Sequence, residues 1–190
     1  MFEAGRRFIF GPMLESVLVE ELAPGDLDSA IPSLSLVLAA CVAKGASIGF
    51  LPPFDAGEAA EFWRKMAVQI CAGERRLLAA RRGGQGGKIL GAVMVVLAMP
   101  ANGRHRAEIS KLIVDPESRR LGIGRALMTA AEALARREGR TLLVLDTRTD
   151  DAAETLYASL GFRKTGVIPD YVRSETGALD STTVMFKLLT

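Results

Sequence analysis

A chain of 190 residues is long enough for one domain with a substantial core. Because 49% of its residues are apolar and only 6% are aromatic, we expect that core to consist of aliphatic side chains and alanine. A formal net charge of +2 argues against a general nucleic-acid-binding protein, and one histidine with two cysteines makes a metal site improbable. Cys41 and Cys71 lie in apolar helical patterns, which predicts buried thiols in a reducing compartment.

The first third of the chain is predicted to be mainly helical. Residues 1–15 show no clean period and are interpreted as a possible N-terminal arm. The uncharged segment 29–43 is too short to span a membrane, so we interpret it as a buried helix and expect a cytoplasmic protein without membrane contact. The predicted elements are a strand at 17–22, a helix at 26–43 that Pro32 kinks or divides, and a helix at 58–71.

The remainder of the chain alternates between strand and helix patterns. Glycine-rich hairpin signals join the first three of its strands into an antiparallel meander. The next helix leads to another apolar strand, and such a βαβ crossover makes the two strands it connects parallel. The predicted elements are strands at 77–80, 89–98 and 107–114, a helix at 122–138, a strand at 141–145, a helix at 151–160 and strands at 162–168 and 182–188. No linker or repeat appears, so we expect a single domain covering residues 1–190.

A loop rich in arginine and glycine precedes the helix at 122–138. In Arg119-x-x-Gly122-x-Gly124 the glycines remove side chains where the backbone must approach a ligand, and the helix start favours a negative charge. We interpret the loop as a pyrophosphate-binding site. Two alternatives remain open: a glycine turn that only closes a helix–strand contact, and a dinucleotide fingerprint. The fingerprint needs a third glycine where Leu127 stands and an acid about twenty residues further on, near Asp146.

Taken together, these motifs resemble the GNAT superfamily of N-acetyltransferases over residues 77–188. The resemblance rests on a strand, a loop, a helix and a short segment in this order: Leu112-Ile113-Val114, Arg119-x-x-Gly122-x-Gly124, the helix that follows, and Leu156-Tyr157-Ala158-Ser159-Leu160-Gly161-Phe162. A closer resemblance, to the tabtoxin resistance protein and its relatives, rests on four further segments: His105-Arg106-Ala107-Glu108, Leu145-Asp146-Thr147, Ala153-Glu154 with Tyr157, and Met185-Phe186-Lys187.

The resemblance implies an α/β fold of the α+β type. Its central mixed sheet would have about six or seven strands, an antiparallel meander followed by a splayed parallel pair, and about four flanking helices. Acetyl-CoA would lie across the splay, within a binding core at residues 107–163. The implied cofactor-binding residues are Leu112, Ile113, Val114, Arg119, Arg120, Leu121, Gly122, Ile123, Gly124, Arg125 and Ala126. Many members have asparagine where this chain has Asp150, and an acid beside a polyanion is unfavourable unless it points away.

Acetyl transfer to an amine needs a base for the ammonium, donors for the oxyanion and an acid for the leaving thiolate. Glu108 is expected inside a strand and Asp146 at the end of its neighbour, and the resemblance implies that these acids bind the amine and take its proton. We expect Glu108 to be buried and to act as the base. The resemblance makes Tyr157 the acid, and a backbone N–H freed by a bulge near 112–114 is the expected oxyanion donor. The structural alternatives are a salt bridge for Glu108, a cap for Asp146 and a core role for Tyr157.

We therefore expect an enzyme that transfers the acetyl group of acetyl-CoA to a primary amine of a small molecule, such as a toxin or an antibiotic-like amine. Direct attack in a ternary complex is expected, because no cysteine lies beside the loop to carry the acetyl group. A monomer or homodimer without a metal is predicted. A protein lysine or N-terminal acetyltransferase and a CoA-sensing module without turnover remain alternatives. Trp63, Phe50 and Phe54 either wall the acceptor pocket or belong to the core.

Overall fold

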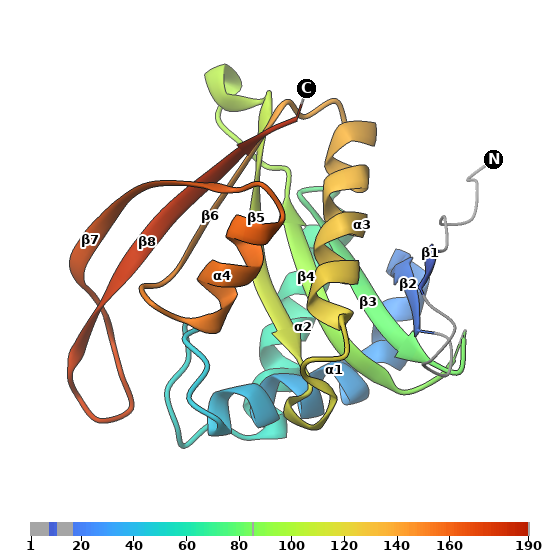
Figure 1. Cartoon of the computed structure of the whole chain (residues 1–190). Coiled ribbons are helices and arrows are strands. Elements are labelled where there is room, and N and C mark those ends of the chain that lie inside the picture. The colour runs from blue at the N-terminus through green and yellow to red at the C-terminus, as the bar shows by residue number, and fades with distance from the viewer. Residues whose placement is uncertain (1–7, 11–16, 85, 190) are drawn as a thin grey trace.

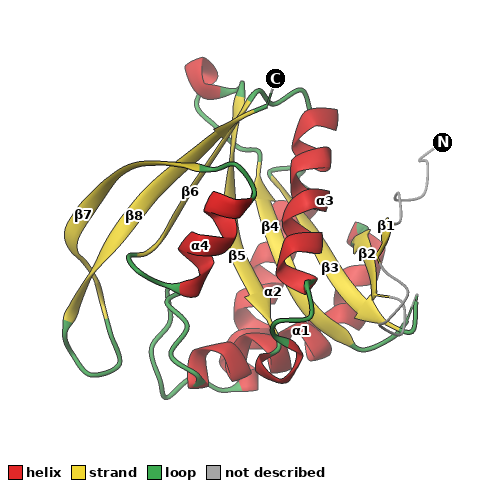
Figure 2. Cartoon of the chain, in the orientation of Figure 1, coloured by secondary structure: helices red, strands yellow, loops and turns green. Residues whose placement is uncertain are grey.

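An eight-stranded mixed sheet forms the centre of the structure, a computed structural model that describes residues 8–10, 17–84 and 86–189 (Figures 1 and 2). The strand order is β1-β2-β3-β4-β5-β6-β8-β7, and only β5 and β6 pair in parallel. The strands are β1 (Phe8–Phe10), β2 (Val17–Glu21), β3 (Arg75–Arg82), β4 (Ile89–Val96), β5 (Arg106–Val114), β6 (Leu142–Arg148), β7 (Arg163–Arg173) and β8 (Leu179–Leu188). The predicted meander and parallel pair are confirmed. The additional strand, β1, lies in the segment interpreted as a possible arm and pairs with β2.

Four α-helices of the described chain cover the two faces of the sheet, as predicted. Figure 1 shows α3 and α4 in front of the sheet and α1 and α2 behind it. The helices are α1 (Leu27–Ala43), α2 (Ala56–Cys71), α3 (Ile123–Arg137) and α4 (Ala152–Ser159), and short 3-10 turns occupy Pro24–Asp26, Ala101–Gly103 and Pro116–Ser118.

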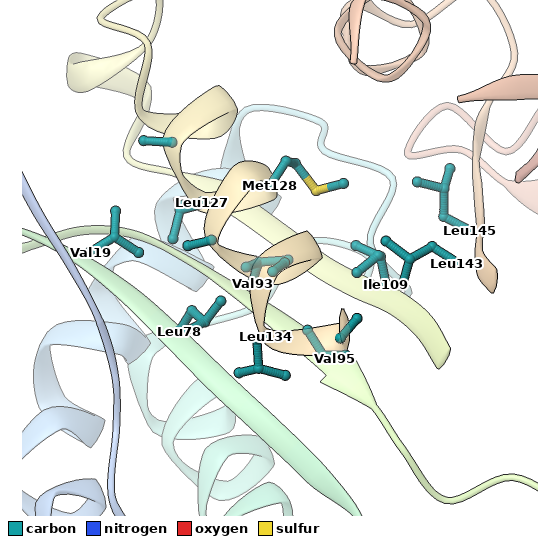
Figure 3. Packing of buried hydrophobic residues seen from close by; sticks show 14 of the residues in the cluster. Val19, Leu78, Val93, Val95, Ile109, Leu127, Met128, Leu134, Leu143 and Leu145 are labelled. Atoms are coloured by element: carbon teal, nitrogen blue, oxygen red, sulfur yellow. The ribbon is translucent and has the colours of Figure 1, made fainter. Parts of the chain in front are cut away.

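Each face of the sheet has its own apolar core. On the α3 face, Leu127, Met128 and Leu134 pack onto side chains that alternate along β3, β4 and β5 (Figure 3). On the other face, α1 and α2 cover Ala92 and Met94 of β4. Because β4 is buried along its whole length, its side chains fill both cores. This rigid centre holds the edges of β5 and β6 in place.

Helix α1 is continuous and apolar. Pro32 does not divide the helix, which runs unbroken through that residue in its second turn. The helical segment Pro24–Ala43, with its 3-10 turn, has 20 residues and is long and apolar enough to cross a membrane, whereas the uncharged segment 29–43 is only part of it. Half of that segment is buried, and its side chains pack beneath the sheet and against α2, as they do in a core helix.

Helix α2 begins earlier than predicted and ends at an exposed thiol. Asp55 caps it, and Glu58 completes a capping box by accepting from the backbone N–H of Asp55, so the helix starts at Ala56. Cys41 is buried as predicted, and its Sγ lies 3.3 Å from the carbonyl oxygen of Val114, to which it donates. Cys71 is exposed, contrary to prediction, because it occupies the last turn of α2 on the solvent side.

The parallel strands β5 and β6 diverge after a short paired stretch. They pair only from Arg106 with Leu142 to Glu108 with Val144, and the strands then separate (Figure 1). Against β4, the register of β5 jumps from Ser110 to Ile113, so the predicted bulge is present. Lys111, inside this bulge, has a φ of 52°. The divergence opens the sheet where the resemblance had implied a splay.

Candidate active site

A cleft of about 850 Å³ runs through the divergence of β5 and β6. It is bounded by the bulge of β5, the loop before α3, the side of α4 and the loop after α1. Predicted site residues that line it are Glu108, Leu112, Ile113, Val114, Arg119, Arg120, Gly122, Ile123, Gly124, Arg125, Asp146 and Tyr157. Two predicted residues, Leu121 and Ala126, do not line it: the first side chain points to solvent and the second is buried beneath α3.

The loop before α3 offers backbone donors to an anion. The first helical hydrogen bond of α3 runs from Ala126 N–H to the Gly122 carbonyl, and the N–H groups of residues 120–125 donate to no acceptor among the described residues. Left-handed backbone at Arg120 (φ 62°) and Gly122 (φ 79°) turns the chain around this point. Free N–H groups at a helix start, together with the helix dipole, suit a pyrophosphate. The residues present therefore fit the diphosphate of coenzyme A.

The two glycines of this loop have different tasks. A Cβ on Gly122 would meet nothing within 4 Å, so its left-handed φ is what favours glycine there. A Cβ on Gly124 would lie 3.2 Å from Cδ2 of Leu156, so glycine lets α3 approach α4 closely. The arginines also differ: Arg125 donates to Ser159 Oγ at 2.7 Å and so ties α3 to α4, while Arg119 and Arg120 are exposed along the cleft.

Replacing Gly122 by valine should weaken CoA binding by about 1.5–3 kcal/mol, which is the usual cost of losing a hydrogen bond to a charged group. The new side chain would project into the cleft, where the diphosphate would approach the N–H groups. Gly139→Val is the matched control, because Gly139 also has a left-handed φ (70°) and open space but lies after the other end of α3. Calorimetric titration with CoA measures both variants, and equal affinities would mean that the loop does not bind the diphosphate.

Glu108 and Asp146 face the same side of the sheet. Ile109 and Leu145 point into the core beneath α3, so their neighbours Glu108 and Asp146 point toward the α1 and α2 side. Glu108 is half-buried rather than buried, and it forms no hydrogen bond or ion pair with the described residues, so the salt-bridge alternative is wrong. Asp146 lies inside β6 rather than at its end, is exposed, and accepts a hydrogen bond from Thr182 Oγ1 at 3.1 Å rather than capping a turn.

Tyr157 reaches the cleft from the opposite side. Its ring is 7% exposed and packs at 5.9 Å from the ring of Phe162, so it is part of the core, and it also lines the cleft. Burial, followed by the charges of Asp151 and Asp146, raises the pKa of its hydroxyl well above the ordinary value. The phenol is therefore protonated at neutral pH and can donate a proton into the cleft.

A second hollow of about 610 Å³ adjoins the cleft between the loop after α1 and the β7–β8 hairpin. Phe50 lines it and stacks on Phe54 at 4.5 Å, whereas Trp63 is 2% exposed and belongs to the core.

Lys111 lines the larger cleft and is half-buried, with Nζ 5.8 Å from the centre of the Phe50 ring and 6.0 Å from that of Phe62. The sequence analysis missed Lys111, because nothing in the local pattern predicts where a bulge turns a side chain.

The sequence model of the acetyltransferase (GNAT) family matches residues 49–162, more than half of the chain. The chain belongs to the GNAT acetyltransferase family. A GNAT structure from Kribbella flavida superposes with a TM-score of 0.74 at 25% identity, covering 91% of this chain and 98% of that one. A putative acetyltransferase from Salmonella typhimurium, solved with acetyl-CoA, gives a TM-score of 0.72 at 21% identity, covering 92% and 94%. The family match identifies an acetyltransferase, and the Salmonella typhimurium structure shares the fold.

Curated relatives of this GNAT protein match less than half of its chain. N-acetyltransferase 8F1 of Rattus norvegicus is 36% identical over 83 residues, which cover 43% of this chain and 38% of the relative. The chain thus matches well under half of that relative's length. The finer resemblance to the tabtoxin resistance protein stays a prediction. Among the described residues, no group of three His, Cys, Asp or Glu side chains is placed to hold a metal ion.

Proposed function

We propose that this GNAT protein transfers the acetyl group of acetyl-CoA to the primary amine of a small molecule, which attacks directly in a ternary complex. The observation that carries the proposal is the position of two carboxylates on one side of the cleft and a protonated tyrosine on the other, with the anion-binding loop at its end. Acetyl-CoA would supply an activated thioester. All other tasks fall to side chains and N–H groups of the protein.

Each group has one proposed task. The loop at 120–125 would hold the diphosphate, and the bulged backbone at 111–113 would bind the pantetheine and offer an N–H to the thioester carbonyl. Asp146 would hold the incoming ammonium, and Glu108 would accept its proton directly or through water. Tyr157 would protonate the departing sulfur. Asp150 is exposed and does not line the cleft, so its charge need not oppose the cofactor.

Support for a small acceptor comes from the walls of the site. The loop after α1 and the β7–β8 hairpin line the hollow that adjoins the cleft. A protein lysine or N-terminus would need a groove open at both ends, so that alternative is less consistent with this hollow. A CoA-sensing module without turnover would have no use for Glu108, Asp146 and Tyr157 around one cleft.

A screen of amines with acetyl-CoA, which follows the release of free thiol, tests the proposal. We expect acceptor-dependent thiol release with small primary amines and none with tertiary amines, which cannot form a stable amide. Preference for protein or peptide acceptors would support the protein acetyltransferase instead. Tight CoA binding with no thiol release for any acceptor would support the sensing module.

A further inference from the structure

The acceptor side of the cleft contains a cation that the proposed chemistry does not use. Lys111 is half-buried, and among the described residues no carboxylate lies within ion-pairing distance of its Nζ. Its Nζ lies over the rings of Phe50 and Phe62, and a Cβ added to Gly49 would lie 3.6 Å from it. Burying an ammonium without an anion is costly, and aromatic faces offset only part of that cost.

The position of Lys111 follows from the bulge of β5. The left-handed backbone at residue 111 carries the side chain to the side of the sheet that bears Glu108 and Asp146. Burial lowers the pKa of its ammonium, as does the nearby Arg75, while Asp146 and Glu108 raise it. Around Lys111, the two cations and the two carboxylates carry equal and opposite formal charge. An acceptor with only a positive charge would add an uncompensated positive charge there.

Arg148, which also lines the cleft, is already paired. Its Nη2 lies 2.9 Å from Oδ2 of Asp151, and its Nη1 lies 3.8 Å from Oδ2 of Asp180. The same Nη1 donates a hydrogen bond to the carbonyl oxygen of Gly45. Lys111 is therefore the better placed cation for a ligand. The neighbouring Ser110 Oγ is buried without a hydrogen-bond partner among the described residues, so a second polar group at the bulge needs a partner from a ligand or water.

From this arrangement we infer that the acceptor is an amine that also carries a carboxylate, which Lys111 binds while Glu108 and Asp146 face the ammonium. The inference rests on the proposed function and specifies its substrate class. The carboxylate of such a substrate faces Lys111, and its ammonium faces Glu108 and Asp146. Because the substrate has no net charge, its binding leaves the net charge around Lys111 unchanged. Binding also places an anion in direct contact with the half-buried ammonium of Lys111, which forms no ion pair with the described residues.

The test compares each standard L-amino acid with its carboxamide and with the amine left after decarboxylation. We expect the wild-type protein to have the lowest KM for the carboxylate form. Lys111→Met keeps the length and apolar stem of the side chain and should raise the KM for the carboxylate form roughly ten- to a hundredfold, the range for a lost hydrogen bond to a charged group. The same variant should change the KM for the decarboxylated amine little. Lys65→Met, on the exposed face of α2, is the control and should alter neither.

Binding separates this inference from the proposed function. Titration of the same compounds into the CoA-saturated protein should show carboxylate-dependent affinity in the wild type and its loss in Lys111→Met. Equal affinity for the acid and amine forms, or an equal loss of both in the variant, would overturn the inference even if amines are acetylated. If the carboxylate-dependent binding is present but no acceptor releases thiol, the proposed acetyl transfer fails and the assigned ligand class stands.

Discussion

Tyr157→Phe should lower kcat by roughly 10²–10⁴-fold if general-acid assistance to the leaving sulfur is lost. The substitution keeps the ring that packs against Phe162 and removes only the hydroxyl, so the core and the CoA affinity should change little. Because burial raises the pKa of this hydroxyl, wild-type activity should not fall through tyrosine ionisation up to a pH of about 10.

Steady-state kinetics with CoA titration measures both effects of this change. Tyr171→Phe is the matched comparison: it removes the hydroxyl of the other tyrosine, which is exposed on β7 and also lines the cleft, and its effect on kcat should be much smaller. Wild-type turnover in Tyr157→Phe would mean that Tyr157 has only a structural role, as the residue of α4 that packs into the core.

Glu108→Gln should depress turnover at neutral pH by about 10²–10⁴-fold, the range for loss of a general base. The carboxylate of Glu108 is available for this role because it is half-buried in the cleft wall and is not paired with any described residue. The loss should shrink as pH rises, since more of the amine then arrives without its extra proton. Asp146→Asn should mainly raise the KM of the amine, because Asp146 is exposed and held by Thr182 in a position to bind a cation.

A pH–rate series on both variants separates the two carboxylates. Glu61→Gln, on the exposed side of α2, controls for the loss of one negative charge. If the Glu108→Gln profile matches that of the wild type at every pH, the proton leaves through Asp146 or directly to water, and Glu108 is not the base.

Local sequence patterns were sufficient to predict most of the helices and strands. Ile123, Leu127, Ala130 and Leu134 recur at helical spacing, and these residues form the buried face of α3. The βαβ pattern predicted the parallel pairing of β5 and β6 because the crossover leaves few other topologies. The glycines of the loop before α3 predicted its free N–H groups, since a left-handed turn before a helix has a signature within a few residues.

Contacts between distant segments decided the rest of the site. Arg125 resembled a ligand for the diphosphate, yet Ser159 of α4 holds it, and no spacing in the sequence relates these two residues. Asp146 was expected at a strand end, but pairing with Val184 of β8 extends β6 beyond it. Cys71 and Cys41 have similar local patterns and differ in burial because only Cys41 lies under the sheet.

The sequence by itself determined the order of strands and helices from residue 17 onward and the glycine turn with free N–H groups before α3, because each depends on neighbours within a turn or a strand. Only the tertiary structure decided which side chains share the cleft. The bulge at Lys111 depends on the register between β4 and β5, and the aromatic faces beneath that lysine come from the loop after α1 and from α2. Such positions follow from packing across the sheet, which no local period encodes.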